Sequence, residues 1–152
     1  MARFRCWIIV ALVGLSGYCA MVQAKDVSAL SEVEVANAQL FLPKPHVSAT
    51  GSRMTIYNRS SHKLVIFAVH SQWFSKSMLH QTSFINGQRQ MHPVKSISIA
   101  PHHQLALTPN TTHLMFMGLK RNLAKGDLIV MTLSTNLGPL KIVAKVVPMQ
   151  LR

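Results

Sequence analysis

Short β-rich runs separated by turn residues follow one another through most of this sequence, and helical periodicity is rare. Residues 64–69 are continuously apolar, which is typical of a strand buried on both faces. We expect residues 70–78 to form a loop or one short helical turn. Other β-rich runs lie at 33–35, 40–42, 54–58, 96–99, 104–107, 128–133 and 140–147. Six or more such runs predict an all-β chain that folds as an antiparallel sandwich or barrel.

The first 24 residues differ in character from the rest of the chain. Arg3 and Arg5 precede an apolar run at 7–15, and small and polar residues follow up to Ala24. This order is typical of a secretory signal peptide that is cleaved after Ala24. The apolar run is shorter than the about 20 residues that a spanning helix needs. We therefore expect no stable membrane span after cleavage, with a retained anchor as the alternative. We assign 1–24 to a signal peptide and 25–152 to a single domain.

Both cysteines, Cys6 and Cys19, lie in the predicted signal peptide. Cys19 raises the alternative of a lipoprotein, but the bulky Tyr18 beside the required cut makes lipid attachment the weaker interpretation. After cleavage the chain would contain no disulfide, no cysteine nucleophile and no thiolate ligand. A blue-copper electron-transfer centre is therefore excluded, because that site needs a cysteine thiolate.

The chain has 16 Lys and Arg residues but only four Asp and Glu residues, which gives a formal net charge of +12. The basic residues are scattered without a dense run, so we expect a solvated basic surface, and an acidic docking partner stays open. Export argues against nucleic acid as a partner. The few carboxylates and the lack of a Gly-x-Ser-x-Gly motif argue against an enzyme.

Two histidines and two methionines form the candidate metal site, spaced as His-x10-Met-x21-His-x-Met: His80, Met91, His113 and Met115. Imidazole and thioether ligands favour copper(I), a soft ion, whereas hard ions prefer oxygen ligands. Two thioethers and two neutral imidazoles add no negative charge, which favours Cu(I) over Cu(II). Because imidazoles bind a metal only when unprotonated, acid should weaken the site. We predict one site, for Cu(I).

Local sequence signals predict how these residues meet. Asn86-Gly87 is a strong hairpin-turn signal, with His80 on the strand before it and Met91 on the strand after it. Such a hairpin brings the two side chains close across the ladder. His113 and Met115 are two residues apart, so on an extended strand they point to one face. We predict that all four side chains converge at one end of the sheet.

Several neighbouring side chains are weaker candidates for the site. Met117 lies on the same strand face as the His-x-Met pair, but a core or supporting role is the better interpretation for a methionine in an apolar strand. Met78 could approach the site from two residues before the first histidine, but packing is the better interpretation. Trp73 either shields the site or packs, and both interpretations stay open. His92 should point away from the site, because it is adjacent to a candidate ligand on an extended strand.

The spacing and its surroundings closely resemble those of the PCuAC-type periplasmic copper(I) chaperones. Residues 113–120, His-Leu-Met-Phe-Met-Gly-Leu-Lys, resemble that family's His-Ile-Met-Leu-Met-Gly-Leu-Lys stretch. Residues 79–82 resemble its first histidine site, and Gly126-Asp127 followed by Thr132-Leu133 resembles the start of its late strand. The resemblance covers roughly residues 33–147, nearly the whole of the cleaved chain.

This resemblance implies a cupredoxin-like Greek-key β-sandwich with one Cu(I) bound near its surface. We expect the exported protein to be a monomer in the periplasm. It also implies delivery of copper to the dinuclear copper centre of cytochrome c oxidase subunit II, often beside a Sco-type protein. Two other functions stay open. One is copper storage or resistance, with the same ligands and a different partner. The other is a basic β-sandwich interaction module with a degenerate metal site.

The chain departs from the family pattern at three places. Gln81 replaces a glutamate, Ser61-His62-Lys63 replaces acidic residues, and residues 109–112 replace a Pro-Gly-Gly-like turn. Asn110 tolerates the left-handed conformation, so it can preserve that turn. None of these changes replaces a candidate ligand. The family's acidic residues are missing here, however, so the docking partner can differ from that of the family.

Overall fold

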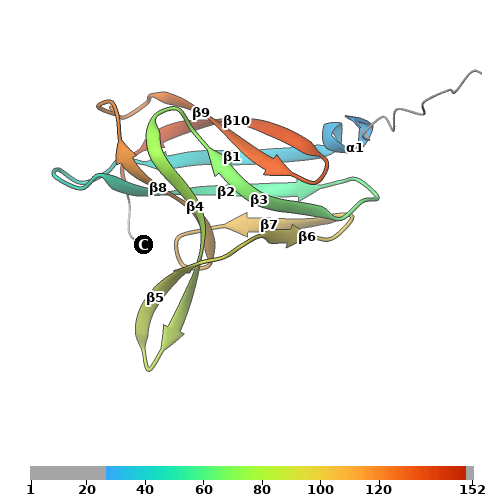
Figure 1. Ribbon diagram of the computed structural model, residues 1–152, viewed down its shortest axis with the longest axis horizontal. Coiled ribbons are helices and arrows are strands. Elements are labelled where there is room, and N and C mark those ends of the chain that lie inside the picture. The colour runs from blue at the N-terminus through green and yellow to red at the C-terminus, as the bar shows by residue number, and fades with distance from the viewer. Residues whose placement is uncertain (1–26, 150–152) are drawn as a thin grey trace, which may run out of the picture.

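Ten strands and one short helix make up the part of the chain that the computed structural model describes, residues 27–149 (Figure 1). The helix is α1 (Val27–Ser31), and the strands are β1 (Val33–Phe41), β2 (Ala49–Asn58), β3 (Leu64–His70), β4 (Phe74–Ile85), β5 (Gln88–Pro93), β6 (Ile97–Ile99), β7 (His103–Leu107), β8 (Thr112–Leu119), β9 (Leu128–Thr135) and β10 (Gly138–Val147). The prediction of an all-β chain is confirmed. The predicted signal peptide, 1–24, lies outside the described residues.

The described strands are joined into one continuous path of paired neighbours. Their order is β5-β4-β8-β2-β1-β10-β9-β3-β6, and β7 pairs with β2 beside this path. The pairs are antiparallel except for β1 with β10. β2 has two partners on one side, because residues 49–51 pair with β8 and residues 54–58 pair with β7. The β5-β4-β8 sheet is therefore attached to the rest of the structure through the first part of β2.

One apolar cluster fills the interior and draws side chains from every described strand except β5. Along β9 and β10 every second residue is buried: Ile129, Met131, Leu133, Ile142, Ala144 and Val146. Each fully buried Leu, Ile, Phe or Met side chain stabilises the fold by about 1.5–3 kcal/mol. Residues 27–149 contain no cysteine, so packing rather than a disulfide holds this part of the chain together.

The prediction that residues 64–69 are buried on both faces is wrong. Phe67 is 52% exposed and Ala68 is exposed, whereas Ile66 and Val69 are buried. The pairing of β3 with β9 shifts register between Ile66 and Ala68, and such a bulge redirects side chains. β3 therefore has one face in the core and one toward solvent, as strands of antiparallel sheets commonly do.

The prediction of a loop or helical turn at 70–78 is also wrong for most of that segment. β3 continues to His70 and β4 already begins at Phe74, which leaves only a short turn between them. Phe74 is buried, and its ring centroid lies 5.1 Å from that of Phe116 on β8. Packing of this aromatic pair outweighs the polar composition of the segment, a tertiary effect that local patterning misses.

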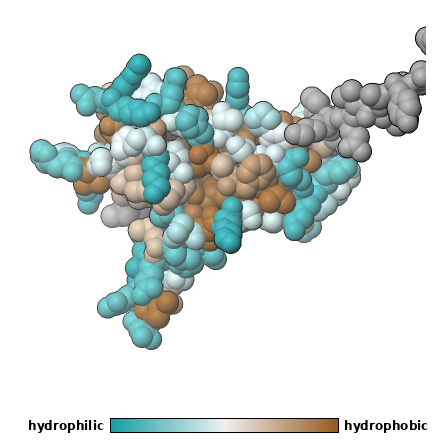
Figure 2. Space-filling view, in the orientation of Figure 1, coloured by the Kyte–Doolittle hydropathy of each residue, from teal (hydrophilic) through white to brown (hydrophobic). Residues whose placement is uncertain are grey.

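The β4–β5 hairpin projects beyond the body of the molecule (Figure 1). Its turn is Asn86-Gly87, and both residues have positive φ, 50° and 76°, as the favoured two-residue hairpin turn requires. All six residues of β5 are exposed. Phe84 and Ile85 near the tip are also exposed, and Figure 2 shows a hydrophobic patch there on an otherwise hydrophilic hairpin. The hairpin predicted from the sequence is therefore present, and Met91 on its outer strand is exposed to solvent.

Candidate metal centre

The two candidate histidines lie directly opposite each other on neighbouring strands. His80 of β4 pairs with His113 of β8. Their ring centroids are 5.9 Å apart and the ring planes are inclined by 75°. At this separation both rings are near enough to contribute ligands to one small cation. The pairing also fixes where the two methionines must lie.

Met115 and Met91 are both diagonal neighbours of His80. Met115 is two residues after His113 on β8, and Met91 lies opposite Thr82, two residues after His80 on β4. Residues that are opposite each other in an antiparallel ladder share a face, so all four side chains lie on one side of the β5-β4-β8 sheet. Diagonal neighbours are about 7–8 Å apart, within reach of long side chains. We call this side of the sheet, which carries the four candidate ligands, the ligand face.

The structure thus brings the four candidates to one face, as the strand parity predicts. The four side chains are not equivalent in position, because His80 is adjacent to all three others. Met91 stands furthest out, with 49% of its surface exposed, whereas His113 is 2% exposed. Their binding of a metal stays a prediction.

Both ring nitrogens of His80 are buried and have no hydrogen-bond partner. Buried polar atoms are nearly always satisfied, and leaving one unsatisfied costs about 1–3 kcal/mol. A soft cation bound by one of these nitrogens would supply the missing partner. The donor set on the ligand face therefore fits Cu(I), which imidazole and thioether ligands favour.

The surroundings of His113 favour one tautomer. Its Nδ1 lies 3.4 Å from the backbone carbonyl oxygen of Thr111. A carbonyl oxygen only accepts, so Nδ1 donates the proton and Nε2 keeps the lone pair that a metal needs. Metal-binding histidines commonly use their second nitrogen in this way, which fixes the orientation of the ring.

Both histidines are biased toward the neutral form that a metal requires. Burial lowers the pKa of His80 below its ordinary value of 6.5, and the charge of the nearby His92 lowers this pKa further. Burial also lowers the pKa of His113; the hydrogen bond to Thr111 opposes this shift, and the charges of His80 and Arg89 add to it. Protons therefore compete less with a metal here than at an exposed histidine.

These pKa shifts predict that the metal-free protein loses stability as the pH falls. Because both pKa values are lowered in the folded state, the unfolded chain takes up protons first as the pH falls through 6.5, and protonation then favours unfolding. Urea denaturation between about pH 7.5 and 5.5 should give a falling free energy of unfolding. A chain with both His80→Leu and His113→Leu should lose less over the same range. Equal losses in the two proteins would contradict this assignment.

Several neighbouring side chains can now be placed. Met117 is half-buried on the ligand face, opposite Lys76 and two residues beyond Met115. Trp73 packs against the core at the other end of β4, with the guanidinium of Arg121 5.7 Å from its ring centroid, so it does not shield the ligand face. His92 pairs with Gln81, and by strand alternation it points to the opposite face, as predicted.

Met78 also lies on the ligand face. It lies directly opposite Met115, two residues along the ladder from the His80–His113 pair. The signal in the sequence was its spacing of two residues from His80. That spacing became informative only once the pairing of β4 with β8 was known.

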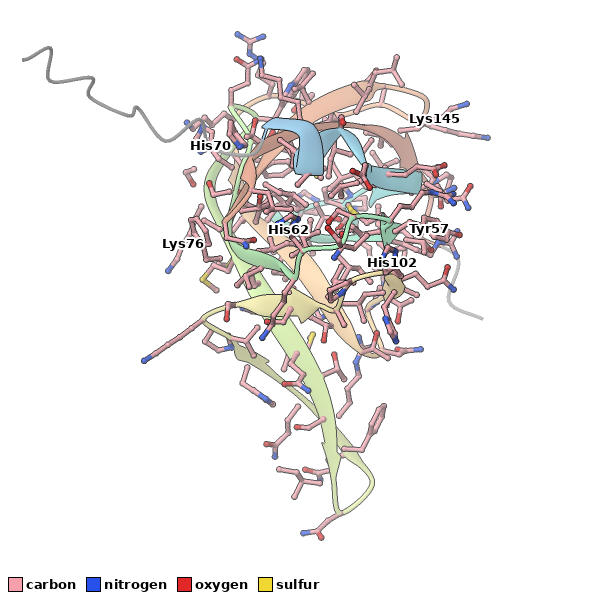
Figure 3. The ribbon with its side chains drawn as sticks, turned by 90° about the vertical axis from the view of Figure 1, so that its right-hand side faces the viewer. Tyr57, His62, His70, Lys76, His102 and Lys145 are labelled. Carbon is pink, nitrogen blue, oxygen red and sulfur yellow. The ribbon has the colours of Figure 1, made fainter. Side chains whose placement is uncertain are left out.

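Other histidines are dispersed over the molecule. His62, His70 and His102 lie apart from one another and away from the projecting hairpin (Figure 3). Within residues 27–149, no three side chains of His, Cys, Asp or Glu are grouped so that they could hold a metal ion.

A basic cleft lies beside the ligand face. It has a volume of about 750 Å³, and its charged lining residues are Arg53, Arg89 and Lys125. Arg89 precedes Met91 by two residues on β5, and its guanidinium donates a hydrogen bond to the carbonyl oxygen of Pro109. That oxygen also accepts a hydrogen bond of 2.8 Å from Oγ1 of Thr82, the residue opposite Met91. Arg89 and Pro109, which line the cleft, therefore lie directly beside Thr82 of the ligand face.

No helix in the described part of the chain is long and apolar enough to cross a membrane.

Comparison with known proteins identifies the family to which the chain belongs. The model of the LpqE-like family of lipoprotein-like proteins matches residues 33–146. The chain is 35% identical over 96 residues to the lipoprotein-like protein Lxx21020 of Leifsonia xyli subsp. xyli (strain CTCB07). This match covers 59% of the present chain and only 58% of the length of that relative.

Solved structures of PCuAC domains share the fold. The copper-bound PCuAC domain from PmoF2 superposes with a TM-score of 0.66 at 17% identity, over 78% of this chain and 94% of that domain. The Cu(I) form of DR1885 from Deinococcus radiodurans matches with a TM-score of 0.61 at 27% identity, over 74% of this chain and 75% of that one. The expected cupredoxin-like Greek-key β-sandwich is confirmed. The chain belongs to the LpqE-like family, and its fold is that of the PCuAC domains.

Proposed function

We propose that this protein is an exported carrier that binds one Cu(I) on the ligand face, through His80, Met91, His113 and Met115. The observation that carries the proposal is the pair of buried, unpartnered ring nitrogens of His80, directly opposite the buried His113. Two thioethers flank this pair on the same face. The similarity to DR1885, whose Cu(I) form has been solved, supports the choice of ion.

The donor set suits carriage rather than catalysis. Four neutral ligands leave the copper as a monocation and favour Cu(I) over Cu(II), which prefers nitrogen and oxygen ligands in tetragonal geometry. Met91 is the accessible edge of the site, since it is 49% exposed on the projecting hairpin. An acceptor ligand can therefore replace the Met91 thioether first, while the less exposed ligands still hold the ion. This exchange needs no change in oxidation state.

The acceptor that we propose is the dinuclear copper centre of cytochrome c oxidase subunit II, with a Sco-type protein as the alternative. The basic cleft beside the ligand face favours an acidic docking surface on that acceptor, because Arg53, Arg89 and Lys125 line it without a carboxylate. Copper transfer should therefore slow as the salt concentration rises. The carrier is proposed to act as a monomer in the periplasm.

Membership of a lipoprotein-like family supports export, and it gives the alternative of lipid attachment at Cys19 more weight than the sequence alone did. We keep cleavage after Ala24 as the proposal, because Tyr18 still precedes that cysteine. The mass of the processed protein distinguishes the two outcomes, since lipid attachment would retain residues 19–24 and add acyl chains.

A transfer experiment separates the three functions considered for this protein. The processed, tag-free chain should take up one equivalent of Cu(I) in competition with a chromophoric chelator. It should then load the copper-free soluble domain of oxidase subunit II faster than the copper dissociates to the chelator alone. Binding without such transfer would indicate storage or resistance. A stoichiometry near zero would leave only the basic interaction module and would contradict the proposal.

A further inference from the structure

Met78 completes a second set of soft ligands within β4 and β8 alone. It lies directly opposite Met115, and the next pair of the ladder that faces the same side is His80–His113, because the Leu79–Leu114 pair between them faces the core. Two successive pairs on this face therefore carry two imidazoles and two thioethers. This set does not need β5, the exposed outer strand of the hairpin.

The geometry places the Met78 thioether within reach of an ion held by the two histidines. Directly opposite Cβ atoms in a ladder are about 4.5–5.5 Å apart. Residues two apart on a strand are separated by about 6.6 Å. Methionine is unbranched and has three rotatable bonds, so its sulfur can move across such a gap. Met91, on the other side of His80, is only a diagonal neighbour.

Packing gives no competing role for Met78 in the interior. It belongs neither to the buried core nor to the half-buried side chains that pack against that core. Its strand neighbour Leu79 points inward instead, opposite the buried Leu114. Met78 is half-buried, like Met115, which is the setting of a side chain at the wall of a shallow site.

We propose that Met78 is an alternative ligand, which replaces Met91 on the copper when Met91 is displaced. The proposal rests on the proposed function, because it concerns the same Cu(I). In the exchange the bond from copper to the Met91 sulfur breaks and a bond to the Met78 sulfur forms. No proton moves and copper stays Cu(I). The ion then rests on His80, His113, Met78 and Met115, and the hairpin side of the site is open to an acceptor.

Four proteins test this exchange: the wild type, Met91→Leu, Met78→Leu and the chain with both changes. Leucine keeps the volume of the side chain, so the fold should be preserved. With Met91→Leu alone, X-ray absorption of the Cu(I) form should still show two sulfur scatterers, and the affinity should fall by no more than about tenfold. With both changes only one sulfur scatterer should remain, and the affinity should fall by a further factor of about 10 to 100.

Met117→Leu in the Met91→Leu background is the matched control, because Met117 lies on the same face, two residues beyond Met115 and further from the two histidines. This change should alter neither the number of sulfur scatterers nor the Cu(I) affinity. If Met91→Leu alone already removes one sulfur scatterer and binds as weakly as the double variant, the exchange is wrong while the proposed function stands. Failure of the wild type to bind Cu(I) would overturn both proposals.

Discussion

Replacing His80 with leucine should abolish most Cu(I) binding without weakening the metal-free fold. His80 is adjacent to all three other candidate ligands, so its loss should cost at least about 100-fold in Cu(I) affinity. The same change removes two buried nitrogens that have no partner, a defect that costs about 1–3 kcal/mol. The free energy of unfolding of the metal-free protein should therefore stay the same or rise. Copper titration and urea denaturation measure the two effects.

His92→Leu is the matched control for this prediction. His92 belongs to the same hairpin but pairs with Gln81 and faces the other side of the sheet. Its replacement should leave the Cu(I) affinity within about twofold. A similar loss of affinity in both variants would show that charge near the hairpin, rather than a specific imidazole, governs binding. A large loss of stability with His80→Leu would show that this histidine has a structural role.

Replacing Gly118 with alanine should strongly destabilise the fold. Gly118 has a φ of 66°, a left-handed conformation that residues with a side chain rarely adopt. A Cβ at this position would lie 1.7 Å from Oγ and 3.0 Å from Cβ of Ser75 on the paired strand. Backbone strain and this clash together should lower the free energy of unfolding by about 3 kcal/mol. Thermal denaturation should show a fall in Tm of about 10 °C.

Two further variants separate the causes of that loss. Gly87→Ala has a similar φ of 76° but no atom within 4 Å of the added Cβ, so it reports strain alone and should cost about 1 kcal/mol. Adding Ser75→Gly to Gly118→Ala should recover the part due to the clash. If Gly118→Ala is no more costly than Gly87→Ala, the close approach of Ser75 does not constrain this site.

The parts of the site that the sequence could predict depend on local geometry. The Asn86-Gly87 turn fixes the hairpin, so His80 and Met91 had to lie on paired strands. Strand alternation alone puts His113 and Met115 on one face. These signals act over a few residues, and each was sufficient without knowledge of the rest of the fold.

The remaining features depend on contacts between distant segments. Pairing of β4 with β8 places Met78 opposite Met115, but no local pattern encodes the register between them. The same applies to Phe74, whose contact with Phe116 brings a polar segment into β4. Phe67 is exposed because of a register shift between β3 and β9, although its own run is wholly apolar.

The most direct test of the proposed site is the X-ray absorption spectrum of the Cu(I)-loaded protein at the copper edge. Two imidazoles and two thioethers predict nitrogen and sulfur scatterers in equal numbers, and the nitrogen contribution should fall in the His80→Leu protein. A first shell without sulfur, or a spectrum that His80→Leu leaves unchanged, would contradict the assignment of the ligand face as the copper site.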